Sequence, residues 1–211
     1  MILEAIVSTL DLAGKVNLAP IGVSWEGERL ILRPYRDSVT FRNLTLLPQG
    51  VVNFTDNVLV FARCAVSEAE FATFPAGRVR GAVLADTCHW REFEVEVAET
   101  APERTRFACR IVGEGRVRDF AGLNRAKHAV IEAAIAASRI PWLGAAEVAR
   151  QVEALTPLVQ KTAGPQEQEA FEFLLDFVRA AERGGSGSRT GAAGQTAGTA
   201  GRGTQPRGGR K

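Results

Sequence analysis

The sequence predicts an α+β fold in which a small antiparallel β-barrel precedes a C-terminal segment of three helices. Two observations support this. Residues 1–113 contain about six short β-rich runs separated by turn residues, which is typical of a small closed barrel. From about residue 120 the apolar residues recur at helical instead of alternating spacing. Strands followed by helices indicate α+β, because an α/β fold would alternate the two.

The first two strands form a predicted hairpin. Ile2–Leu10 is a predicted strand, because it is rich in apolar and β-branched residues. Asp11–Gly14 is the predicted turn, and Val16–Trp25 is the second strand of the hairpin. Pro20 and Gly22 interrupt the returning strand, so we expect an irregular backbone there, with N–H and C=O groups that a planar ring could use.

The clearest strand runs from Arg91 to Val97, where apolar and acidic residues alternate strictly. Its glutamates, at positions 92, 94 and 96, are expected to face solvent. Thr105–Ile111 alternates in the same way and should pair with it. The remaining predicted strands are Arg29–Leu32 and Val51–Phe54, and residues 71–77 are predicted to be loop.

Helical spacing predicts three C-terminal helices, the first of them from about Leu123 to Ser138. The second covers Ala145–Val159, and the third starts at Gly164-Pro165 and ends at Arg183-Gly184. In the barrel half, a helix is predicted at Val39–Leu47 and another at Val58–Cys64, the latter capped by Asp56.

The chain therefore divides into a barrel at 1–118, a helical segment packed on it at 119–183, and a tail at 184–211. The tail holds 10 of the 21 glycines and no bulky apolar residue, so we expect it to be disordered. It also carries five of the 26 basic residues and no acid, which leaves 21 basic against 24 acidic residues before it. Nucleic-acid binding by the body is therefore not expected. The arginines of the tail could bind RNA weakly through phosphates, but the favoured interpretation is a solvated tail.

Composition excludes several classes of protein. The N-terminal apolar run contains Glu4 and lacks a basic start, so we do not expect it to be a signal peptide. No apolar run in the sequence reaches the length of a membrane span. We expect a cytoplasmic protein. Three cysteines and two histidines at these spacings assemble no zinc site, so no metal is predicted. Cys88 and His89 are adjacent, and on a strand they would point to opposite faces.

The most informative stretch is Arg33–Leu44, which follows a predicted strand and opens a predicted helix. Pro34 ends the strand, and Asp37 or Ser38 can cap the helix. A helix N-terminus flanked by arginines and hydroxyls suits a phosphate monoester. An ordinary capped surface helix with solvated arginines remains the alternative.

Three motifs follow one another in an order that resembles the FMN-binding split-barrel flavoproteins. They are Asn17-x-Ala19-Pro20, Arg36-Asp-Ser38-x-Thr40-x-x-Asn43-Leu44 and Val51-Val-Asn53. With the helical run Leu123–Ala133, the chain is similar to an uncharacterised flavin-nucleotide-binding family of methanogens and of bacteria with methanopterin-linked one-carbon metabolism. The resemblance covers about residues 1–180 and implies a split barrel and an FMN-binding homodimer with the flavin between the subunits.

The resemblance also implies which residues contact the flavin. Phosphate contact falls on Arg36, Ser38 and Thr40, and contact with the ring or ribityl chain on Asn17, Ala19, Pro20 and Asn53. The chemistry of the stretch adds Arg33, Tyr35 and Asn43. Flavin reductases carry a lysine where this chain has Arg36, which keeps the charge and adds a fork suited to two phosphate oxygens.

Lys127 and His128 have two interpretations. They can lie at the edge of a helix that Asn124 caps, or a partner subunit can supply them near the flavin ring, where a cation favours the anionic reduced form. The catalytic residues stay unknown.

Three functions remain open. The first is a flavin-dependent oxidoreductase that uses a nicotinamide or pterin-type donor and a small acceptor. The second is a non-catalytic flavin nucleotide carrier or sensor, because no residue stands out as an acid, base or nucleophile. The third is a binding module that uses the basic tail on RNA or an acidic protein surface.

Overall fold

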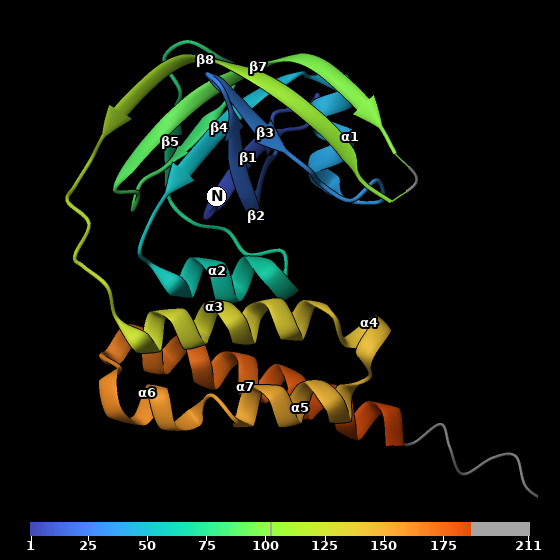
Figure 1. Cartoon of the computed structure of the whole chain (residues 1–211), viewed down its shortest axis with the longest axis vertical. Helices are drawn as coiled ribbons and strands as arrows, with labels where there is room; N and C mark the ends of the chain where they lie inside the picture. Colours follow the sequence, from blue (N-terminus) through green and yellow to red (C-terminus); the bar gives the residue numbers. More distant parts are fainter. Residues whose placement is uncertain (102, 187–211) are drawn as a thin grey trace, which may run out of the picture.

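A computed structural model describes residues 1–101 and 103–186, and the predicted disordered tail lies almost entirely outside them. Six antiparallel strands close into a barrel in the order β1-β2-β3-β8-β7-β4, and a layer of helices lies beneath it (Figure 1). The strands are β1 (Ile2–Leu10), β2 (Val16–Glu26), β3 (Arg29–Leu32), β4 (Gln49–Phe54), β7 (His89–Thr100) and β8 (Thr105–Arg116). The predicted α+β class and the six-stranded barrel are confirmed.

The β1–β2 hairpin is regular throughout, so the predicted irregularity at Pro20 and Gly22 is wrong. Each residue from Val16 to Ser24 has a partner in β1, without a register shift. On its other side β2 pairs with β3 only from Ser24 onward. Pro20 therefore lies in a strand with one free edge, where its missing N–H breaks no ladder bond.

Strand β7 departs from strict alternation at two register shifts against β8, between Glu92 and Phe93 and between Val95 and Val97. The prediction that Glu92 faces solvent is therefore wrong. Its carboxylate is buried and accepts hydrogen bonds from the backbone amides of Gly77, Arg78 and Val79. The bulge turns this side chain toward the 77–79 loop, which the carboxylate holds against the sheet.

Short elements occupy the connections of the barrel. Helix α1 (Val39–Leu46) joins β3 to β4, and α2 (Val58–Val66) follows β4. The segment predicted as loop at 71–77 contains β5 (Thr73–Pro75), which pairs with β6 (Ala82–Leu84). A three-residue strand gives too little periodicity to be recognised from sequence, and only its distant partner defines it.

Within the described residues the C-terminal layer has five helices instead of the three predicted, and the first and the last of them pack on α2. They are α3 (Arg125–Ser138), α4 (Ile140–Leu143), α5 (Ala145–Glu153), α6 (Thr156–Thr162) and α7 (Pro165–Ser186). The predicted single helix over Ala145–Val159 is divided because Pro157 lacks the N–H that would continue it. Helix α7 runs on to Ser186, beyond the predicted stop at Arg183-Gly184.

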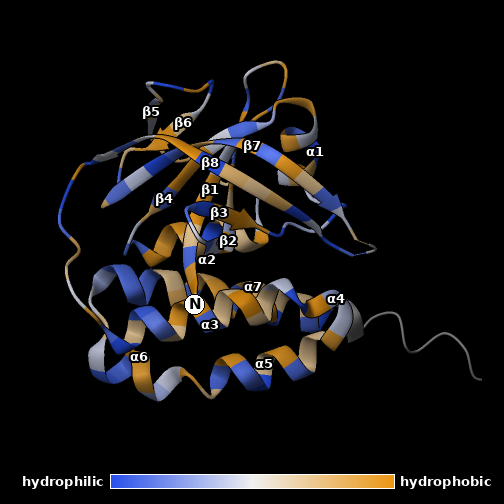
Figure 2. Ribbon diagram, turned by 45° about the horizontal axis from the view of Figure 1, so that its top comes forward, coloured by the Kyte–Doolittle hydropathy of each residue, from blue (hydrophilic) through white to orange (hydrophobic). Residues whose placement is uncertain are grey.

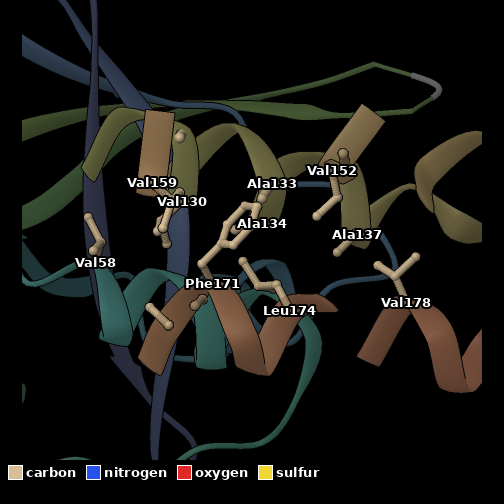
Figure 3. Close-up of a cluster of buried hydrophobic side chains, with 14 of the residues drawn as sticks. Val58, Val130, Ala133, Ala134, Ala137, Val152, Val159, Phe171, Leu174 and Val178 are labelled. Atoms are coloured by element: carbon tan, nitrogen blue, oxygen red, sulfur yellow. The ribbon is translucent and has the colours of Figure 1, made fainter. Parts of the chain in front are cut away.

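The helical layer has its own core, which lies between the helices and α2. Figure 3 shows Phe171 and Leu174 of α7 among the small side chains of α3, with Val58 of α2 and Val152 of α5 around them. Orange and blue residues alternate along α5, α6 and α7 (Figure 2), as expected for helices with one buried face. Among the described residues, no helix has the length and apolar character needed to cross a bilayer.

A partly buried ionic network ties the barrel to the helices. Arg118, just after β8, forms ion pairs with Asp56 (2.6 Å) and Asp86 (2.7 Å). Lys127 of α3 donates to the carbonyl of Asp56 (2.6 Å) and pairs with Glu167 of α7 (2.9 Å). Asp56 therefore does not cap α2 as predicted; its neighbour Asn57 does, accepting from the amide of Leu59.

Burial acts to raise the pKa values of Asp56 and Glu167, but their hydrogen bonds outweigh it. Arg118 and the Ala121 amide hold the pKa of Asp56 below its ordinary value, and Lys127 and the Gly164 amide do the same for Glu167. Both carboxylates are therefore charged in the folded protein at neutral pH, and the network joins opposite charges.

Candidate functional site

The N-terminus of α1 faces outward beside the barrel. Ser38 is its N-cap, as one of the two predicted alternatives: its Oγ accepts from the Phe41 amide (3.1 Å) and donates to the carbonyl of Tyr35 (2.6 Å). The next two amides, of Val39 and Thr40, belong to the first turn, where no intrahelical acceptor exists. The capped loop therefore presents the positive end of a helix dipole, which suits an anion.

Arg36 adds a full positive charge beside this helix end. Its backbone amide donates to the carbonyl of Glu103 (3.2 Å), which ties the loop to the β7–β8 turn. Its side chain is exposed and forms no ion pair with any residue that the structure describes. The guanidinium is therefore free to bind an anionic ligand.

A polar network connects the same helix to the hairpin. Asn17 of β2 donates to Thr40 of α1 (3.1 Å), and Asn43 of α1 donates to Thr9 of β1 (3.1 Å). Thr40 and Asn43 are buried, with 2% and 4% of their surface exposed. Because the Thr40 hydroxyl accepts from Asn17, its own proton remains to be donated.

Ala19 and Pro20 lie on the free edge of β2, next to Asn17. Both are half-buried, and this stretch pairs with β1 on one side only within the described residues. Every second residue of such an edge directs its backbone N–H and C=O away from the sheet. Open backbone N–H and C=O groups are therefore present at this stretch, as predicted, but they belong to the free edge of a regular strand and not to an irregular one.

The other predicted contacts lie elsewhere. Arg33 pairs with Glu26 (3.1 Å), and its guanidinium also reaches Ser24 (3.4 Å). Asn53 is completely buried: its amide nitrogen donates to Ile6 and Ser8, and its oxygen accepts from the Leu84 amide. Asn53 therefore joins β1, β4 and β6 inside the protein, and its predicted flavin contact stays untested.

Lys127 and His128 lie at the start of α3, at the opposite end of the molecule from α1 (Figure 1). Asn124 caps this helix, as one of the predicted alternatives had it. The Lys127 ammonium is engaged in the ionic network, whereas the His128 side chain is 73% exposed, with Glu132 at 3.9 Å. Within one chain neither residue reaches the α1 site.

Thr9 is a site residue that sequence reasoning missed. It is completely buried at the end of β1 and receives the amide hydrogens of Asn43 (3.1 Å) and Asn17 (3.5 Å). A signal was present, because Ser8-Thr9 is a polar pair that directly follows the apolar run Ala5–Val7. A buried hydroxyl in such a position needs partners, which indicates a polar neighbour.

The cysteines do not form a reactive site. Burial raises the pKa of Cys64 and of Cys109 to about 12, and burial also raises the pKa of Cys88. The Cys88 sulfur faces Asp56 and Arg118, whereas the adjacent His89 ring stacks on Phe54 with 4.6 Å between centroids. In the part of the chain that the structure covers, no group of three His, Cys, Asp or Glu residues could hold a metal ion.

Comparison with known proteins gives matches over most of the chain. A family model described as "Protein of unknown function (DUF447) N-terminal domain" matches residues 3–118, and a second model of that name matches residues 124–176. An FMN-bound DUF447 protein from Methanosarcina mazei is 24% identical; the match covers 83% of this chain and 94% of that one, with a TM-score of 0.74.

Two further structures match a little over half of the chain. A flavoredoxin from Methanosarcina acetivorans is 16% identical over 55% of this chain and 69% of its own, with a TM-score of 0.48. A 2-nitrobenzoate 2-nitroreductase from Pseudomonas fluorescens is 18% identical over 54% and 64%, with the same TM-score.

Proposed function

The chain belongs to the DUF447 family, and from this membership and the α1 site we propose that it binds FMN, with the phosphate at the N-terminus of α1. The observation that carries the proposal is the pairing of an open helix N-terminus with the unpaired guanidinium of Arg36. The FMN-bound state of the Methanosarcina mazei protein, which shares this fold over 83% of the chain, supports the choice of flavin.

The residues present fit a phosphate monoester. Arg36 offers a fork for two phosphate oxygens, and the first-turn amides of α1 offer further donors. The Thr40 hydroxyl has a proton to donate, because it already accepts from Asn17. In this arrangement Ser38 shapes the loop as the N-cap, and its hydroxyl can contact the phosphate only by giving up its bond to Tyr35.

The flavin ring and ribityl chain are proposed to lie along the free edge of β2. Asn17, Ala19 and Pro20 occupy this edge, and Asn43 supports Thr9 behind it. Neither Arg33 nor Asn53 has a side chain open to this edge, so the fit rests on the remaining predicted residues.

We also propose a homodimer with the flavin between the subunits. The free edge of β2 is long and flanked by exposed apolar residues, among them Ile2 (67% exposed) and Leu12 (64% exposed). Such an edge is normally protected, and a second subunit would cover it together with one face of the flavin. In that assembly Lys127 or His128 of the partner subunit could be supplied to the ring.

Bound FMN would supply hydride or single-electron transfer between a donor and an acceptor. The chain's own part is to bind the phosphate, hold the ring and exclude water at the subunit interface. We therefore infer an oxidoreductase that takes electrons from a nicotinamide or pterin-type donor. The second candidate, a carrier or sensor of flavin nucleotide, is favoured by the α1 site itself, where none of the described residues is placed as a general acid or nucleophile.

Reduction of the bound flavin separates the two candidates. The purified protein, loaded with FMN and kept free of oxygen, is mixed with NADH or NADPH, and flavin absorbance is followed. Bleaching faster than that of free FMN under the same conditions is the expected result for an oxidoreductase. Bleaching at the rate of free FMN with both donors would reject nicotinamide-dependent reduction.

A further inference from the structure

A cavity lies beside the α1 site, between the loop before α1 and the short helix α4. Its volume is 590 Å³, within the range of small-molecule pockets. It is lined by Tyr35, Arg36, Asp37, Glu103, Arg139, Trp142 and Leu143. The lining residues come from the loop before α1, the β7–β8 turn and the region of α4, and Figure 1 shows these three segments on the same side of the molecule.

One wall of the cavity is aromatic. The Trp142 and Tyr35 rings are stacked, 6.3 Å between centroids and 22° apart, and the Arg104 guanidinium lies 3.9 Å from the Tyr35 centroid. Trp142 is nevertheless 70% exposed and Tyr35 42%. An exposed indole beside a second ring is a platform on which a planar base can stack.

The other groups around the cavity are charged, with both signs present. Arg36 and Arg139 are exposed and have no ion-pair partner among the described residues, so either can bind phosphate. Asp37 and Glu103 are acceptors of the kind that bind ribose hydroxyls or an exocyclic amine. A ring platform, two phosphate-binding cations and two hydroxyl acceptors are together the chemistry of a purine nucleotide.

We propose that this cavity binds a purine nucleotide, with the base on Trp142 and Tyr35 and the phosphate on Arg139. Two sources share this chemistry, a free nucleotide and the adenylate half of a dinucleotide electron donor. The second source rests on the proposed function, because only a flavin in the neighbouring α1 site would need such a donor. The binding of a simple nucleotide does not rest on it.

Calorimetric titration of the full-length protein with ADP tests the site, and it is run both without FMN and after loading with FMN. We expect ADP to bind in both forms, and ribose 5-phosphate, which has no base, to bind at least tenfold more weakly. Trp142→Leu and Arg139→Ala should each weaken ADP binding about tenfold. Arg179→Ala, which removes an exposed arginine on α7, should leave it unchanged.

Three results would overturn the proposal. They are no ADP binding up to millimolar concentration, equal affinity in Trp142→Leu and wild type, and displacement of bound FMN by ADP, which would make the cavity part of the flavin site. Melting temperatures of both variants show that they remain folded. A parallel titration with NADH identifies the source: the same dependence on Trp142 and Arg139 indicates the dinucleotide, and ADP binding alone indicates a free nucleotide. Failure of FMN to bind at all would contradict the proposed function and leave the ADP result intact.

Discussion

We expect Arg36→Ala to weaken FMN binding by about tenfold to a hundredfold, because a charge-assisted hydrogen bond to phosphate contributes roughly 1.5–3 kcal/mol. Arg36 is exposed and forms no ion pair among the described residues, so its removal should leave the melting temperature unchanged. Quenching of flavin fluorescence during titration of the FMN-free protein measures the dissociation constant.

Matched variants sharpen this prediction. Arg36→Lys keeps the charge and loses the planar fork, so it should fall between wild type and Arg36→Ala. Arg179→Ala removes an equally exposed arginine from α7 and should bind FMN as the wild type does. If the Arg36→Ala and wild-type titration curves superpose, the phosphate does not lie at the start of α1.

Arg118→Ala lowers the free energy of unfolding by about 3 kcal/mol at pH 7, because it strips the buried Asp56 carboxylate of its cation. Asp56 is only 7% exposed, and Arg118 also bonds Asp86 at 2.7 Å. Denaturation by urea, followed by circular dichroism, gives the difference. Arg110→Ala is the control, because its pair with Glu94 lies on the surface and should contribute less than about 1 kcal/mol.

The pH dependence of this loss has a definite sign. Arg118 holds the pKa of Asp56 below its ordinary value of 3.8, so the pair stabilises the fold fully above that pH. As the pH falls through the lower folded-state pKa, Asp56 becomes protonated and the contribution disappears. The difference between wild type and Arg118→Ala should therefore shrink in acid. A difference that stays constant from pH 7 into that range would show that Arg118 acts through packing.

The barrel was predictable because its strands carry local signals. The alternating glutamates predict β7, the apolar run predicts β1, and the turn residues at Asp11–Gly14 predict the hairpin. The bulge that buries Glu92 was not predictable from the local pattern. The Glu92 carboxylate is buried because it accepts hydrogen bonds from the backbone amides of residues 77–79, which are distant in the sequence. Pro157 marks the break between α5 and α6, but the helical spacing of the apolar residues continues across it and predicts one helix.

The site was predictable where chain neighbours form it. Arg36, Ser38 and Thr40 lie on one loop and helix start, so their proximity follows from the sequence. Contacts across the fold were not predictable. The Asn53 side chain donates to the Ile6 carbonyl of β1, which lies far from it in the sequence. Trp142 contacts Tyr35 only because the helical layer packs against the barrel. Pairings between distant segments leave no local pattern to recognise.

The central claim is that FMN is held between two copies of this chain, and sedimentation velocity at micromolar concentration tests it most directly. The FMN-loaded protein is followed at a flavin wavelength and a protein wavelength together. The account predicts that both signals sediment as one species of twice 22.7 kDa, with one FMN per chain. Removal of the FMN should shift the species toward the monomer, because flavin binding and dimerisation are linked. A 22.7 kDa species that carries one FMN per chain would contradict the account.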